Sequence, residues 1–135
     1  MKLRRLDHTE PCPVCGALCG GSIRFRFHHP GGEEVVFEMN REVFAFASGP
    51  VVQQAFKAGT YPELPGLIRE ANECRGWEDA GGEVERPALE LLSTVRCFLG
   101  VEQGPLVDVA ALEALRGFAE EAVGAGVPTV WALWD

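Results

Sequence analysis

Hydrophobic and polar residues alternate between residues 22 and 47, and this period of two predicts β-strands. Ile23, Phe25 and Phe27 alternate with polar side chains, and the following stretch HHPGGEE is typical of a turn. The segments VVFEM and EVFAFA continue the hydrophobic pattern after that turn. We therefore expect an antiparallel β-meander of two or three strands, with one face on a core and the other toward solvent.

After SGP at 48–50 the hydrophobic period becomes helical. A short helix is expected over 51–57, with Val52, Ala55 and Phe56 on one side. Three further helices are expected. The first has Pro65 in its first turn, the second runs from Pro87 to Gly100, and the third runs from Asp108 as its N-cap to Gly124. These three to four amphipathic helices require an apolar surface, which the sheet and their own neighbours provide.

The last hydrophobic segment, 128–134, is rich in β-branched and aromatic residues. It predicts a strand that is buried on both faces and completes the sheet, so that Trp131 and Trp134 point to opposite faces. The preceding polar segment 75–87 is expected to be a loop. The fold class that follows is α+β in a single domain over 1–135, with an N-terminal zinc-knuckle-like cysteine cluster.

Charge divides this domain into two parts. Residues 1–30 carry five basic and two acidic side chains, whereas 31–135 carry seven basic and eighteen acidic ones, for a net charge of −8 over 135 residues. The basic 1–30 segment is also rich in cysteine and histidine. Because an acidic body repels phosphate backbones, nucleic acid is an unlikely partner, apart from a contact at Arg24 and Arg26 in the stretch RFRF.

Three of the five cysteines lie within the stretch EPCPVCGALCGG, at Cys12, Cys15 and Cys19. Thiols at this density in a polar segment have little use in packing, and they predict a metal site. The pentapeptide CPVCG resembles the metal-binding knuckle of zinc-ribbon and rubredoxin-like proteins, in which two thiolates two residues apart hold one ion. The resemblance covers five residues, and the second C-x2-C pair of a zinc ribbon is missing here.

The resemblance implies one structural zinc per chain, and zinc takes four ligands. We expect Cys12, Cys15 and Cys19 to be joined by His28, with His29, His8 and Cys74 as alternatives for the fourth ligand. Iron in place of zinc stays open. Cys74 and Cys97 continue the apolar stripes of their helices, and both are expected to be small buried hydrophobic residues.

The chain contains none of the familiar sequence signatures of phosphate-binding loops, zinc proteases or serine hydrolases. We therefore expect a small, zinc-stabilised, non-catalytic binding or accessory protein that acts through contacts with another protein. Two alternatives stay open: an acidic inhibitor or immunity-type partner of a basic protein such as a nuclease or polymerase subunit, and a small metal-dependent enzyme.

The N-terminal sequence MKLRRLDHTEP has basic residues but no apolar run behind them, and no segment approaches the roughly 20 apolar residues of a membrane span. A cytoplasmic protein with no membrane contact is the expectation. A cytosolic thiol cluster is more often a metal site than a disulfide framework, so this expectation agrees with the proposed zinc.

Overall fold

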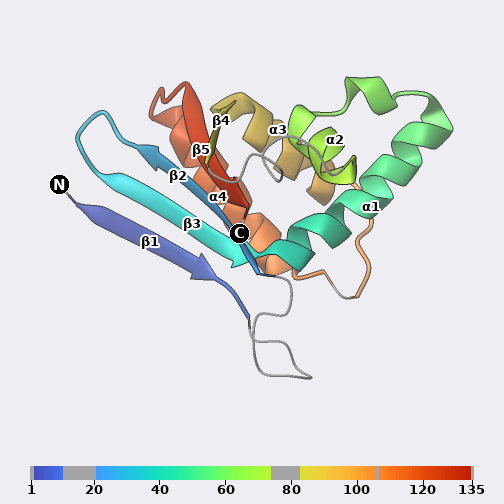
Figure 1. The fold of residues 1–135 in the computed structure, drawn as a ribbon, viewed down its shortest axis with the longest axis horizontal. Helices are drawn as coiled ribbons and strands as arrows, with labels where there is room; N and C mark the ends of the chain where they lie inside the picture. Colours follow the sequence, from blue (N-terminus) through green and yellow to red (C-terminus); the bar gives the residue numbers. More distant parts are fainter. Residues whose placement is uncertain (1, 11–20, 74–82, 106, 135) are drawn as a thin grey trace.

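The computed structural model describes residues 2–10, 21–73, 83–105 and 107–134, and within them the fold is α+β (Figure 1). A five-stranded mixed sheet is joined to four α-helices in these residues. No helix of the described part is long and apolar enough to cross a membrane. The elements in chain order are β1 (Leu3–His8), β2 (Ser22–His28), β3 (Glu34–Asn40), α1 (Arg41–Ala58), the 3-10 helix η1 (Tyr61–Glu63), α2 (Gly66–Asn72), β4 (Val84–Pro87), α3 (Ala88–Leu99), α4 (Val109–Gly124) and β5 (Thr129–Trp134).

The strands lie in the order β1-β3-β2-β5-β4. β2 and β3 form the predicted antiparallel hairpin, in which Phe25 is paired with Phe37. β1 was not anticipated, and it runs parallel to β3, so the sheet is mixed and not a pure antiparallel meander. β5 is inserted between β2 and β4, as predicted for a strand that completes the sheet.

The segment EVFAFA at 42–47 was predicted to be a strand, and this prediction is wrong. It forms the first turns of α1, which continues through Pro50 to a left-handed cap at Gly59 (φ 73°). Residues Val43, Phe44, Ala47 and Val51 are buried, and their spacing is helical. The run VFAFA is apolar at every position, so the short segment by itself fits a strand as well as a helix, and packing on the sheet decides between them.

The other helices follow the sequence patterns closely. The C-terminal strand is present, but the prediction that it is buried on both faces is wrong, because Val130 and Ala132 are fully buried on the core side whereas Trp131 and Leu133 on the opposite side are only partly buried. Asp108 is the N-cap of α4, and its Oδ1 accepts a hydrogen bond from the backbone N–H of Ala111 at 3.2 Å. Two further details differ. Phe56, expected on the apolar side of its helix, is 60% exposed. The final four residues of the predicted loop 75–87 form the short edge strand β4.

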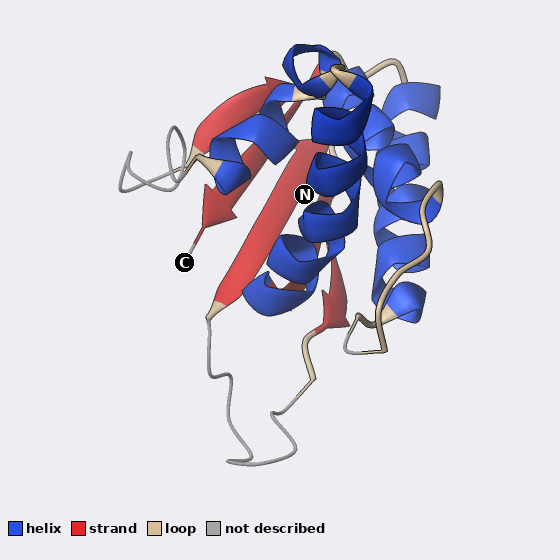
Figure 2. Cartoon of the chain, turned by 90° about the vertical axis from the view of Figure 1, so that its right-hand side faces the viewer, coloured by secondary structure: helices blue, strands red, loops and turns tan. Residues whose placement is uncertain are grey.

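The helices gather on one side of the sheet (Figure 2), and the core lies between these two layers. Alternate residues of the central strands face this core and are fully buried, whereas the intervening residues face away from the helices. An edge-to-face aromatic contact joins the layers, with ring centroids 5.1 Å apart for Phe27 of β2 and Phe118 of α4, and a second one, of 5.0 Å, joins α1 to α3 through Phe44 and Phe98. The opposite side of the sheet is left without a covering layer in the described residues, and we call it the open face.

Candidate functional site

The open face presents charged and apolar side chains in rows that run across the strands. The pairing of β1, β3, β2, β5 and β4 places Arg5, Val36, Arg26, Trp131 and Glu85 in one such row. Every member comes from a different strand, so the row exists only because of the strand order. Apolar and ionic groups therefore alternate along it.

Arg26 is held in place from two sides. Its Nε and Nη2 donate hydrogen bonds of 2.6 and 2.9 Å to the two carboxylate oxygens of Glu83, and its guanidinium lies 5.4 Å from the centroid of the Trp131 ring. The hydrogen bond from Arg26 lowers the pKa of Glu83 below its usual value, and Glu83 in turn raises the pKa of Arg26. The positive charge of Arg26 is therefore largely neutralised by Glu83.

Arg24, two residues earlier on the same face, is less completely paired. Its Nη2 lies 3.4 Å from an Oε2 of Glu38, and the same oxygen accepts a shorter hydrogen bond of 2.7 Å from Ser22. The Nε of Arg24 is buried, and it has no hydrogen-bond acceptor among the described residues. Arg24 thus has donor capacity that its carboxylate neighbour does not use.

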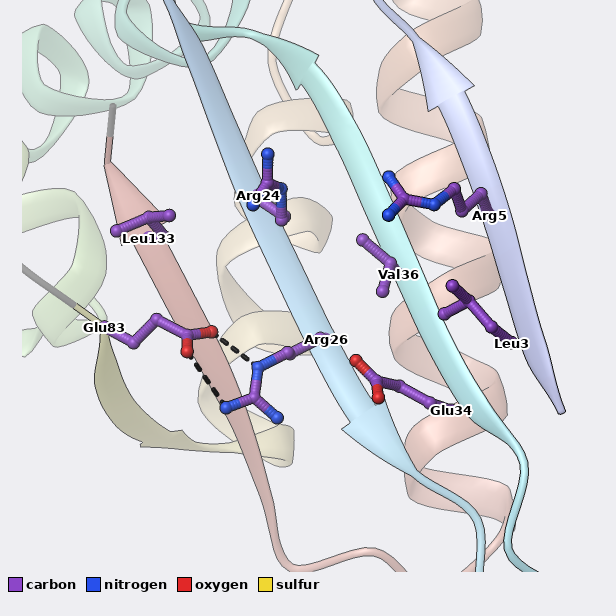
Figure 3. A pocket seen from close by; sticks show the side chains of 8 residues that line it. All are labelled: Leu3, Arg5, Arg24, Arg26, Glu34, Val36, Glu83 and Leu133. Carbon is purple, nitrogen blue, oxygen red and sulfur yellow. Dashed lines mark hydrogen bonds and ion pairs between the residues drawn. The ribbon is translucent and has the colours of Figure 1, made fainter. Parts of the chain in front are cut away.

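A shallow hollow of about 260 Å³ lies on the open face between β1 and β5 (Figure 3). The side chains around it are three arginines, two glutamates and three aliphatic residues: Arg5, Arg24, Arg26, Glu34, Glu83, Leu3, Val36 and Leu133. Cationic groups outnumber anionic ones here by one, in a chain whose net charge is −8. The hollow is therefore a local exception to the acidic character of the molecule.

A second ionic cluster joins the β2–β3 hairpin to α4. His29 Nε2 donates a 2.6 Å hydrogen bond to Glu121, and Arg4 binds both Glu121 and, at 2.9 Å, Glu33. The histidine nitrogen and the carboxylate oxygens lie close enough together to ligate one cation. However, the guanidinium of Arg4 already supplies the positive charge that these two carboxylates require, so the cluster is best described as a structural ion-pair network.

The predicted zinc ligands are only partly described. Cys12, Cys15, Cys19 and Cys74 lie outside the described residues, so their arrangement stays a prediction. His28 is exposed at the end of β2, where its Nε2 accepts a hydrogen bond of 3.3 Å from Arg26 and lies 3.9 Å from Glu34.

The residues on either side of the cysteine segment 11–20, Glu10 and Gly21, are held at one end of strands β1, β2 and β3. Glu10 and Asn40 exchange hydrogen bonds of 3.2 and 2.8 Å, and the carbonyl of Gly21 accepts one of 3.2 Å from Arg41. His8 lies at this same end, with its ring stacked on Phe37. His28 lies at the other end of β2, six residue steps from Ser22 and thus about 20 Å away at roughly 3.3 Å per residue.

Cys97 was predicted to be a small buried residue, and it is only partly buried. It lies on α3 and packs against the core, and burial raises the pKa of its thiol. A nucleophilic cysteine requires the opposite shift, toward the thiolate.

Sequence reasoning anticipated that Arg24 and Arg26 share the open face, because their alternation with Ile23, Phe25 and Phe27 requires it. It missed Arg5 on β1 and Glu83 just before β4, since neither strand was predicted and nothing in the sequence indicates that these residues approach the arginines of β2. No family model, curated protein or solved structure matches this chain.

Proposed function

We propose that the protein is a small, non-catalytic binding or accessory protein, and that it contacts another protein through the open face of its sheet. The observation that carries this proposal is the row Arg5–Val36–Arg26–Trp131–Glu85, in which groups of both charges alternate with apolar ones. Aromatic residues and arginine are enriched where proteins meet, and interfaces combine apolar contacts with a polar surround.

The same row disfavours a nucleic acid as the partner. A phosphate backbone is bound by cationic side chains that are free to neutralise it. On this face Arg26 is paired with Glu83, and Glu34 and Glu38 also lie on the open face beside the arginines. A protein partner tolerates these acids, because it offers basic and acidic groups in the same surface.

Affinity capture from the source organism tests the proposal when an open-face variant is compared with a matched one. Leu3 is 53% exposed on the open face, and Leu89 is 66% exposed in the first turn of α3. We expect Leu3→Glu to abolish capture of a specific protein and Leu89→Glu to preserve it. Capture that survives Leu3→Glu, or no specific capture by the unaltered protein, would contradict the proposal.

We also propose that the cysteine segment holds one structural zinc through Cys12, Cys15 and Cys19. For the fourth ligand the geometry favours His8 over His28, because His8 lies at the end of the sheet where the segment is attached. Zinc would stabilise this segment, which contains few apolar residues that could pack in a core.

Metal analysis of purified protein should find about one zinc per chain. Cys12→Ser and Cys15→Ser should lose that zinc, and His8→Ala should lower zinc affinity, with His28→Ala as its control. Protein that contains no metal, and whose thermal melting does not change with a chelator, would contradict the zinc proposal. Iron would be recognised by visible absorbance, which zinc thiolates lack.

A further inference from the structure

The hollow on the open face contains arginine donors that the protein itself does not saturate. Arg26 is fully engaged by Glu83 and Trp131. Arg24 has a single carboxylate contact, of 3.4 Å, among the described residues, and its side chain is 37% exposed. Arg5 is exposed and makes no ion pair within the part of the chain that the structure describes.

These two arginines are placed so that both reach into the same space. Arg5 lies on β1 and Arg24 on β2, with β3 between them and an offset of two residues along the strands, so their backbones are separated by about 12 Å. Figure 3 shows both side chains on the open face with the aliphatic side chain of Val36 between them. The two arginine side chains therefore lie on either side of the hollow, and Val36 forms its apolar floor between them.

We propose that this hollow binds the carboxylate of an aspartate or glutamate side chain of the partner protein, held between Arg5 and Arg24. The inference rests on the proposed function and names the chemistry that the open face recognises. Guanidinium groups bind carboxylates through paired, charge-assisted hydrogen bonds. The aliphatic side chain of Val36, which lies between the two arginines, suits the methylene groups that precede such a carboxylate.

The surroundings of the hollow favour a side chain of a protein over a free small anion. Leu3 and Trp131 border the same face, and only a longer chain segment would cover them together with the arginines. Glu34 and Glu83 line the hollow too, and their negative charge opposes a phosphate more strongly than a single carboxylate.

The test uses ¹⁵N-labelled full-length protein and follows the side-chain Nε–H resonances of its arginines by NMR. The probe is an octapeptide of alternating glutamate and valine, which as an extended chain places all its carboxylates on one side. We expect saturable shifts at Arg5 and Arg24, and no shifts with the matching lysine–valine peptide. Arg5→Ala and Arg24→Ala should each lower the affinity for the glutamate peptide at least tenfold, whereas Arg116→Ala on α4 should leave that affinity unchanged.

Sodium glutarate and inorganic phosphate are titrated under the same conditions as free anions. Binding of either anion as tightly as the glutamate peptide would overturn the inference, and so would a peptide affinity that is unchanged in Arg5→Ala and Arg24→Ala. Retained dispersion of the backbone amide spectrum shows that the variants are folded. A captured partner that is lost in Leu3→Glu but kept in Arg5→Ala and Arg24→Ala would refute the carboxylate site while leaving the proposed function intact.

Discussion

Glu121 is the residue on which the link between the hairpin and α4 depends. Burial by itself would raise the pKa of Glu121, but hydrogen bonds from His29 and Arg4, together with the positive charge of Arg4, lower it overall. A carboxyl group whose pKa is lowered by folding stabilises the folded state above its unfolded pKa, and that contribution is lost as the pH falls through the folded pKa. The ionised form of Glu121 therefore matters at neutral pH.

Replacement of Glu121 by glutamine should lower the free energy of unfolding by about 1 kcal/mol at pH 7, since partly exposed charged hydrogen bonds are screened by solvent. The matched control is Glu120→Gln, because Glu120 is more exposed and its nearest cation, Arg116, is 3.9 Å away. Urea unfolding from pH 7 to pH 3 measures both variants. The Glu121 deficit should shrink as the pH falls; a deficit that grows at low pH would show that another group carries the stabilisation.

At the scale of elements, one glycine lies within α1 and a second one caps it, and the two differ in what they require. Gly49 lies in an exposed part of the helix, and a Cβ added there would meet no atom within 4 Å apart from its chain neighbours, one of which is Pro50. Gly59 caps the helix with φ of 73°, a conformation that side-chain-bearing residues adopt only with strain.

Gly59→Ala is therefore expected to destabilise the protein by about 1 kcal/mol, because alanine is strained at a positive φ. Gly49→Ala should change stability little, because the helix preference of alanine, about 1 kcal/mol, is opposed by the clash of its Cβ with the Cδ of Pro50. Thermal unfolding followed by circular dichroism would measure both changes. A Gly59→Ala variant as stable as the unaltered protein would show that the left-handed cap does not require glycine.

The elements that the sequence predicted correctly are those whose local pattern and tertiary environment agree. α3 and α4 have one wide apolar stripe with clear end signals at Gly100 and Asp108, and β5 is almost entirely apolar. The first half of α1 was predicted wrongly because the segment 42–47 is short and Pro50 suggested a break. Its burial against the sheet outweighs the local preference.

The edge strands had no comparable signal. β1 reads LRRLDH, with leucines three residues apart, and β4 reads VERP, which is only four residues long. Their pairing depends on partners that are distant in the sequence. For this reason the alternation of Arg24 and Arg26 was predictable, whereas the convergence of Arg5 and Glu83 on the same hollow was not.

For the whole molecule, the distribution of charge is more informative than its total. The net charge of −8 opposes polyanions at long range, and on the open face carboxylates contact Arg24 and Arg26 directly. The positive charge suggested by RFRF is thus balanced by neighbouring acids, closely at Arg26 and more loosely at Arg24. The net charge of the molecule and the carboxylates on the open face therefore both oppose the binding of nucleic acids.

We therefore predict that the protein does not bind single- or double-stranded DNA or RNA with a dissociation constant below about 10⁻⁴ M at physiological salt, the weak limit of non-specific binding. Fluorescence anisotropy at two salt concentrations measures this. The double variant Glu38→Gln/Glu83→Gln removes the two carboxylates that pair with Arg24 and Arg26, and it should gain salt-sensitive binding. Micromolar binding by the unaltered protein that disappears in Arg24→Ala/Arg26→Ala would show instead that the open face recognises nucleic acid, because the arginines would then exchange their glutamates for phosphates.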